Sequence, residues 1–247
     1  MSASAPPAAA RARRRVLVCG ATGRLGVAIA RALAARGDHV VLTARDGARL
    51  ELLAADLARL GPEGRHGFLA VDLRDPDAPS RLREALHEGG GRVEDIVLAC
   101  GPFPHTPVDE LRREDVEATL AVHAVAPLLV VAGLADDLRA SRGAVVALGD
   151  AGVTRPYPNH VAYLAAKGAL EAGLRALAVE LAPHVRLNTL ALGIVSDPEA
   201  DADTRRTHRL KARSPLGRFG TPEEVVHATL ALLDATWATG EVWGVGR

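Results

Sequence analysis

Short, uninterrupted apolar runs alternate with longer amphipathic segments along most of the chain. The apolar runs predict strands at 16–19, 40–43, 68–71, 96–99, 144–148, 185–190 and 241–245. The segments between them predict helices at 26–36, 47–60, 80–87, 109–138, 160–181 and 222–233. Strands without polar alternation, each followed by a helix, indicate a parallel sheet that is covered on both faces. The pattern therefore predicts a single α/β domain with a doubly wound parallel sheet of about seven strands.

Two segments do not follow this alternation. Residues 1–15 are rich in Ala and Pro and end in three arginines, and we expect a disordered tail before a domain that covers 16–247. The apolar run after these arginines is too short for a signal peptide, so a cytoplasmic protein is expected. Residues 196–214 are polar and charged, which predicts an inserted substrate loop or lid, or partial disorder.

Composition narrows the class of partner. The 30 basic and 30 acidic residues give a formal net charge of zero, which favours neither nucleic acid nor an anionic membrane. No apolar run in the sequence is long enough to predict a membrane span. Cys19 and Cys100 end two apolar runs without a further Cys or His at ligand spacing, which indicates small buried residues rather than a metal site or a disulfide. We expect a small-molecule partner and no metal.

A glycine-rich turn follows the first predicted strand and leads directly into a helix. Glycines allow a sharp turn and a close approach to a pyrophosphate, and a helix start offers unpaired N–H groups. The turn predicts a dinucleotide site, and the alternative is an ordinary glycine turn. The expected cofactor-binding residues are Gly20, Thr22, Gly23, Arg24, Leu25 and Gly26.

The end of the second predicted strand favours NADP(H). A carboxylate there would bind the ribose 2′-hydroxyl of NAD, but this chain has Arg45, a bidentate partner for a 2′-phosphate. Arg24 in the glycine turn could reach the same phosphate. Asp72 and Leu73 follow the third strand, where the adenine edge would lie. The alternative is that Arg45 is a solvated surface residue.

Tyr163 and Lys167 are four residues apart on a long predicted helix, which places both side chains on one face. An ammonium beside a phenol favours the phenolate, so the pair could transfer a proton near neutral pH. This spacing is common by chance. Its place after the fifth strand strengthens the prediction of a catalytic pair, because ligands of doubly wound sheets lie at the carboxyl ends of the strands.

With these motifs the sequence resembles the short-chain dehydrogenase/reductase family from residue 16 to about 245. Within that family it is most similar to pteridine reductases and dihydromonapterin reductase-like members. The resemblance rests on the glycine turn, Asp72, Tyr163-x-x-x-Lys167, Arg186-Leu187-Asn188 and residues 217–224, and the narrower one on Arg24-Leu25-Gly26, Phe103 with Thr106-Pro107, and Asp150 in place of the usual catalytic serine.

The resemblance implies a Rossmann-type NADPH-dependent reductase that transfers hydride to a C=N or C=O bond of a small, ring-shaped substrate. It implies proton delivery by Asp150, Tyr163 and Lys167, with Phe103 stacked on the substrate beside Asp150 and Tyr163. It also implies a homo-oligomer, either a dimer or a tetramer. The further cofactor contacts that it implies are Ala99, Gly101, Tyr163, Lys167, Gly193 and Val195.

The sequence departs from the family pattern at three places. The family's Asn-Asn-Ala-Gly should fall within 98–102, where no asparagine occurs, and its Pro-Gly is Leu192-Gly193. The family's helix asparagine aligns with His123, which either holds the relay water or titrates in its place, or simply bonds a backbone carbonyl. His105 and His160 fall in loops near the site, with ordinary surface positions as the alternative. Two other functions stay open: a ketone or alcohol dehydrogenase of secondary metabolism, and a non-catalytic NADP-binding regulatory protein.

Overall fold

Seven parallel strands form one continuous sheet in the order β3-β2-β1-β4-β5-β6-β7. The computed structural model describes residues 13–60, 66–196 and 204–246. The chain order reverses between β1 and β4, which lie side by side at the centre of the sheet. The predicted doubly wound α/β fold is confirmed. The strands are β1 (Arg15–Cys19), β2 (His39–Ala44), β3 (Gly67–Ala70), β4 (Asp95–Leu98), β5 (Ala144–Asp150), β6 (Arg186–Leu192) and β7 (Val242–Val245).

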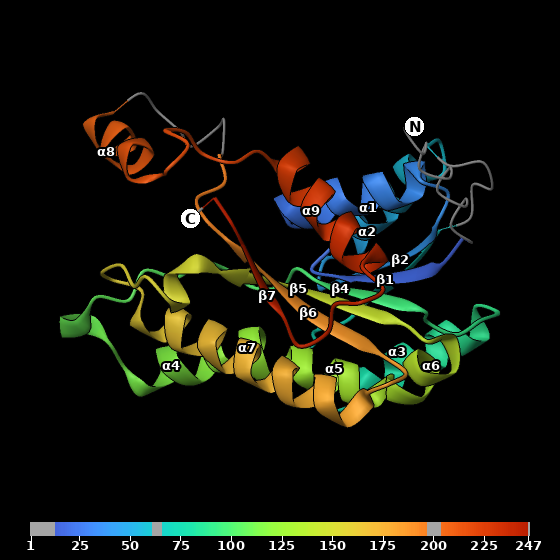
Figure 1. Ribbon diagram of the computed structural model, residues 1–247. Coiled ribbons are helices and arrows are strands. Elements are labelled where there is room, and N and C mark those ends of the chain that lie inside the picture. Colours follow the sequence, from blue (N-terminus) through green and yellow to red (C-terminus); the bar gives the residue numbers. More distant parts are fainter. Residues whose placement is uncertain (1–12, 61–65, 197–203, 247) are drawn as a thin grey trace, which may run out of the picture.

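Helices cover both faces of the sheet (Figure 1). One face carries α1 (Arg24–Ala35), α2 (Gly47–Leu57) and α9 (Pro222–Asp234). The opposite face carries α3 (Ala78–Glu88), α4 (Arg113–Leu120), α5 (Ala126–Gly133), α6 (Ala135–Ser141) and α7 (Val161–Leu181). Two apolar cores result, one on each side. Consecutive residues of β1 divide between them, since Val16 and Val18 face one core and Leu17 and Cys19 the other.

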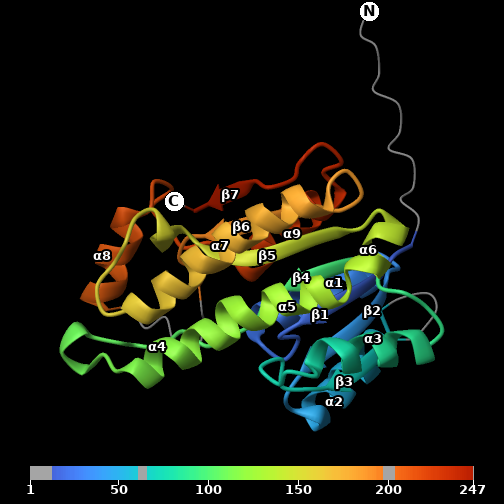
Figure 2. The same ribbon diagram turned by 90° about the horizontal axis from the view of Figure 1, so that it is seen from below.

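The helix predicted over 109–138 is interrupted. After the 3₁₀ turn η1 (Val108–Glu110), α4 passes through a π-helical turn, η2 (Ala121–Val125), into α5. Pro127 begins α5 and has no N–H to bond the carbonyl four residues earlier, which favours the wider π turn. The whole run Arg113–Gly133 is long and apolar enough to cross a membrane by length and composition, contrary to the sequence expectation. In this structure the run lies along α7 (Figure 2).

The polar segment 196–214 is not entirely irregular. Residues Arg205–Arg213 form α8, and the Thr204 hydroxyl caps it by accepting the Thr207 N–H over 3.2 Å. The sequence analysis missed this helix because the segment carries too few apolar residues to show a helical period. Residues 197–203 lie outside the described residues, so the expected lid stays a prediction.

A buried ion pair joins three strands at the amino end of the sheet. Asp95 is 1% exposed and accepts hydrogen bonds from Arg14 Nη2 at 2.9 Å and from the Ala144 N–H at 2.8 Å. Arg14 and Arg15 therefore belong to the folded domain, although the sequence analysis placed them in the tail. Residues 1–12 lie outside the described residues.

Candidate active site

The glycine turn lies at the carboxyl end of β1 and leaves no room for side chains. Gly20 has a φ of +78°, and a Cβ there would lie 2.5 Å from the carbonyl oxygen of Ala99. A Cβ on Gly26 would lie 2.3 Å from the oxygen of Gly20. Gly23 is the N-cap of α1 and supplies no side chain to its first amides. This tight cradle at a helix start fits the pyrophosphate of a dinucleotide.

Arginines gather where an adenosine phosphate would lie. Arg45 is exposed just after β2. Arg49, in the first turn of α2, donates through Nη2 to the carbonyl of Thr22 over 2.9 Å. Arg24 instead donates to the carbonyl of Ser196. The sequence analysis overlooked Arg49, although its spacing from Arg45 was a usable signal.

Asp72 is engaged by an arginine that the sequence analysis also overlooked. Its Oδ1 accepts a hydrogen bond from Arg74 Nε at 3.0 Å, and its Oδ2 lies 2.5 Å from Arg74 Nη2. These bonds, with the charge of Arg45 as a smaller cause, lower the pKa of the Asp72 carboxyl to about 2. Asp72 is therefore an anion held at the carboxyl end of β3, next to Leu73.

The other expected cofactor contacts lie in the loops after β4 and β6. The Ala99 N–H donates to the carbonyl of Cys19. Gly101 has a φ of +103°, and the His123 ring fills the space that a Cβ on Gly101 would occupy. Gly193 packs so closely on the carboxyl-terminal strand that a Cβ would lie 2.1 Å from the Gly246 oxygen. Val195 forms a bridge with Gly220.

The predicted catalytic residues meet between β5 and α7. Asp150 is the last residue of β5, and its Oδ2 accepts a hydrogen bond from the Tyr163 hydroxyl over 3.1 Å. Lys167 Nζ donates to the carbonyl of Leu148 at 2.7 Å and lies 5.7 Å from the centre of the Tyr163 ring. Tyr163 and Lys167 are 8% and 5% exposed. The folded chain thus brings an acid from the end of β5 next to a phenol and an amine of α7.

Burial and the Asp150 carboxylate keep the phenol of Tyr163 protonated. Burial raises the pKa of Tyr163 well above its usual range, and the Asp150 charge raises it further. Burial lowers the pKa of Lys167 to about 8, against the opposing charges of Cys100, Asp150 and Glu171. The sequence analysis expected the ammonium to favour a phenolate. In the structure, desolvation and the neighbouring carboxylate outweigh that effect, so the phenol holds its proton at neutral pH.

His123 lies in the π turn against the catalytic tyrosine. Its Nε2 bonds the carbonyl of Pro102 at 2.8 Å, and its ring meets the Tyr163 ring edge-on, with centroids 5.1 Å apart. Because a carbonyl only accepts, Nε2 carries the hydrogen and Nδ1 has a free lone pair. Nδ1 is buried and has no hydrogen-bond partner among the residues that the structure describes. Burial, with the Lys167 charge, lowers the pKa of His123 to about 4, so the ring is neutral.

An aromatic cluster borders the catalytic tyrosine. Phe103 stacks on His160 with centroids 4.1 Å apart, meets the Tyr163 ring edge-on at 4.8 Å, and is 58% exposed. His160 is fixed by a 2.7 Å hydrogen bond between Nδ1 and the carbonyl of Pro104. Tyr157 completes the cluster, and its hydroxyl donates to Asp150 Oδ2 at 3.0 Å. The sequence analysis did not identify Tyr157, whose only signal was its place in the loop before α7.

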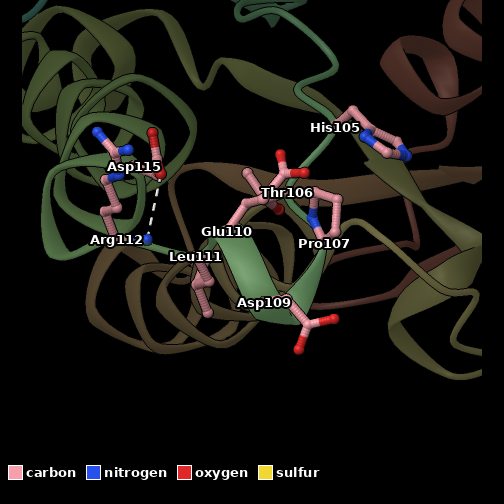
Figure 3. A pocket seen from close by; sticks show the side chains of 8 residues that line it. All are labelled: His105, Thr106, Pro107, Asp109, Glu110, Leu111, Arg112 and Asp115. Carbon is pink, nitrogen blue, oxygen red and sulfur yellow. Dashed lines mark hydrogen bonds between the residues drawn. The ribbon is translucent and has the colours of Figure 1, made fainter.

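A separate polar hollow of about 490 Å³ opens beside η1 (Figure 3). Carboxylates of Asp109, Glu110 and Asp115 line it. His105 also lines it and meets His160 edge-on at 5.6 Å, so the hollow adjoins the aromatic cluster. The catalytic pair itself does not line it.

Comparison with known proteins points to one family along nearly the whole chain. A family profile described as enoyl-(acyl carrier protein) reductase matches residues 20–246. L-xylulose reductase of Bos taurus is 33% identical over 90% of this chain and 89% of its own. D-threitol dehydrogenase of Mycolicibacterium smegmatis is 30% identical over 87% of this chain and 84% of its own. An NADPH-bound short-chain oxidoreductase of Pseudomonas aeruginosa, described as having an atypical catalytic centre, superposes with a TM-score of 0.87 at 25% identity, covering 94% of this chain and 95% of its own.

Proposed function

The chain belongs to the short-chain dehydrogenase/reductase family and is an oxidoreductase that acts on a small substrate, and from this premise we propose that it reduces a C=N bond of a ring-shaped substrate with NADPH. The observation that carries the proposal is the hydrogen bond from Tyr163 to the Asp150 carboxylate. A carbonyl substrate is the second candidate.

The residues at the carboxyl ends of β1 and β2 support NADP(H) as the cofactor. The close-packed glycine turn would hold the pyrophosphate, and Arg45 with Arg49 would bind the 2′-phosphate. The NADPH-bound relative supports the same choice. When bound, the cofactor supplies the hydride, and the chain provides orientation and the proton. Lys167 would bind the nicotinamide ribose.

Tyr163 is the proposed proton donor because its phenol stays protonated and its ring lies edge-on to the exposed Phe103. His123 is proposed to hold a water through its unpaired Nδ1, in the role of the family's missing asparagine. Both roles suit reduction, in which the substrate gains a proton. Oxidation of an alcohol would require a phenolate beside the Asp150 carboxylate, which the charge of that carboxylate opposes.

The charge of Asp150 favours an imine over a ketone. Three donors point at its two oxygens: the Gly152 N–H and the hydroxyls of Tyr157 and Tyr163. An anion at this position stabilises the positive charge of a protonated C=N bond, whereas it disfavours the negative charge that develops on a carbonyl oxygen.

The exposed ring of Phe103 supports a flat substrate. Its position next to Tyr163 would allow a planar ring to stack on it within reach of the phenol. A pterin-like ring meets both requirements, since it is planar and carries a reducible C=N bond. The relatives described above act on polyols and sugars by name, so they support a small substrate and do not specifically favour a pteridine.

The names of these relatives favour the second candidate, a reductase of ketones or sugars. L-xylulose reductase and D-threitol dehydrogenase are relatives with at least 30% identity over most of both chains. The two candidates differ in what they require of Asp150. A carbonyl reductase gains nothing from an anion beside its proton donor.

The test is NADPH oxidation against a dihydropteridine, a cyclic imine, a xylulose and an aryl ketone at pH 7. We expect the imine-type substrates to have the higher kcat/KM and Tyr163→Phe to lose at least about a hundredfold in rate. Higher kcat/KM on the carbonyl substrates would favour the second candidate. Unchanged turnover in Tyr163→Phe would contradict the assignment of the proton donor.

A further inference from the structure

Asp150 holds two tyrosines rather than one. Its Oδ1 accepts the Gly152 N–H at 2.7 Å, and its Oδ2 accepts the Tyr157 hydroxyl at 3.0 Å and the Tyr163 hydroxyl at 3.1 Å. The proposed function uses only Tyr163. Tyr157 comes from the loop between β5 and α7, where the family resemblance assigns no role.

Packing aims the Tyr157 hydroxyl at the carboxylate. A Cβ on Gly152 would lie 2.3 Å from Tyr157 Cε1, so the ring lies directly on the 3₁₀ turn that follows Asp150. The ring also meets His160 edge-on, with centroids 5.4 Å apart, and lies 6.2 Å from Phe103. These contacts fix the ring on two sides, and its hydroxyl direction does not depend on the carboxylate alone.

The hydrogen bond from Tyr163 to Asp150 must break during catalysis. Tyr163 donates its hydrogen to Asp150, so it must turn that hydrogen away to protonate a substrate. The half-buried carboxylate would then lose a donor, and an ionised group that loses donors in a partly desolvated site is destabilised. Tyr157 remains in place as a second donor to the same oxygen.

We propose that Tyr157 is a positioning residue: it holds the Asp150 carboxylate in place while Tyr163 turns its proton toward the substrate. This role rests on the proposed function. It acts through Asp150, and Tyr157 need not touch the substrate. The titratable neighbours of the three groups are Lys167 on α7, which interacts with Asp150, His123 in η2 against the Tyr163 ring, and His160 before α7 against the Tyr157 ring. Cys100 and Glu171 lie next in line and act on Lys167.

The kinetic test is a double-mutant cycle of Tyr157→Phe and Asp150→Asn. Tyr157→Phe removes one hydroxyl and keeps the ring contacts. We expect it to lower kcat by roughly tenfold to a hundredfold, the usual effect of one hydrogen bond to a charged group, with KM changed less than about threefold. In the Asp150→Asn background the same change should lower kcat by less than about twofold, because the carboxylate is already gone.

Thr154→Ala is the matched control. Thr154 lies in the same loop, and its hydroxyl bonds the carbonyl of Ala151 rather than Asp150. Its kcat should equal that of the wild type. If Tyr157→Phe lowers kcat by the same factor in both backgrounds, or does not lower it at all, the proposal is wrong.

A second readout does not depend on turnover. The chain has two tyrosines, so the phenolate absorbance near 295 nm reports Tyr157 and Tyr163 alone. Burial raises the pKa of both phenols, and the charge of Asp150 raises it further. We therefore expect both to ionise at lower pH in Asp150→Asn than in the wild type, and Tyr157→Phe to leave the Tyr163 signal by itself.

The two readouts separate this proposal from the proposed function. If the wild type reduces no imine or carbonyl substrate but both phenols respond to Asp150→Asn, the proposed function fails and the coupling of Tyr157 to Asp150 stands. If only Tyr163 responds, Tyr157 does not act through Asp150 and the positioning role is overturned, whatever the substrate.

Discussion

Tyr163 and Asp150 form a hydrogen bond of 3.1 Å in which the phenol of the proposed proton donor donates to a carboxylate. A neutral partner would not oppose ionisation of the phenol, whereas the negative charge of this carboxylate disfavours the phenolate. The hydrogen bond thus places a negative charge beside the phenol. It favours groups that become positive during the reaction, and it keeps the tyrosine in the form that can give a proton.

Asp150→Ser is expected to change the substrate preference. Serine supplies a neutral hydroxyl, so the stabilisation of a protonated imine is lost and the penalty on a developing oxyanion is removed. We expect kcat/KM for a cyclic imine to fall at least about tenfold, and kcat/KM for an aryl ketone to hold or rise. The measurement is NADPH oxidation on both substrates at pH 7. An equal fall on both substrates would show that Asp150 does not discriminate by charge.

Lys167→Met is expected to stabilise the cofactor-free protein and remove its activity. Burial lowers the pKa of Lys167 from 10.5 to about 8, so the folded state disfavours the ammonium. Because the unfolded state binds more protons between pH 8 and 10.5, the wild-type stability due to this group rises over that interval. At pH 7 the variant should gain on the order of 1–3 kcal/mol in the free energy of unfolding.

Urea unfolding at pH 7 and pH 10 measures this effect, and the gain should shrink at the higher pH as the wild-type lysine loses its proton. Lys211→Met is the control, because Lys211 lies on the partly exposed α8 over the Phe219 ring. It should change stability by less than about 1 kcal/mol. A stability loss in Lys167→Met as large as that of a core deletion would mean that its bond to Leu148 outweighs the desolvation of its charge.

His123 is expected to contribute to acid sensitivity. Its pKa is lowered from 6.5 to about 4, so the unfolded state binds more protons in that interval and stability falls as the pH decreases through it. The loss due to this residue at pH 5 should be about 1–2 kcal/mol relative to pH 7. His123→Asn should remove that part of the pH dependence, and the exposed His184→Asn should not. Chemical unfolding at both pH values tests this, and identical profiles of His123→Asn and wild type would refute it.

Arg45→Ala is expected to weaken NADPH binding by about tenfold and to leave NADH binding nearly unchanged, because only the 2′-phosphate is lost as a partner. Arg49→Ala should have a smaller effect in the same direction, since its Nη2 also bonds Thr22. Arg59→Ala, exposed after α2, serves as the control. Fluorescence titration with both cofactors provides the measurement. Equal losses for NADPH and NADH in Arg45→Ala would contradict a 2′-phosphate site.

The sequence predicted what depends on local pattern. Apolar runs without alternation located the strands, and the glycines at 20, 23 and 26 located the turn. At Gly20 and Gly26 the backbone leaves no space for a Cβ. The pairing of Tyr163 with Lys167 followed from helical spacing. Asp150 was placed with them by the family resemblance, in which it stands where the usual catalytic serine would be.

Other features depend on tertiary contacts that no local pattern records. The π turn at His123 reflects a proline four residues later, and the periodicity of the apolar residues runs through it without a break. Tyr157 reaches Asp150 because its loop folds back over Gly152. The direction of the Tyr163 pKa shift depends on burial and on Asp150 together. The four-residue spacing of tyrosine and lysine gives no information about either.

The buried pair of Arg14 and Asp95 lies at the opposite end of the sheet from Asp150 and Tyr163. The bonds that hold the strands together and the proposed substrate site therefore lie at opposite ends of the same sheet. Substitutions in the loops that carry Phe103 and Tyr157 can change which substrates are accepted, and they leave intact the bonds that join β1, β4 and β5. This separation makes the protein a suitable starting point for directed evolution of its specificity, provided that Arg14 and Asp95 are left unchanged.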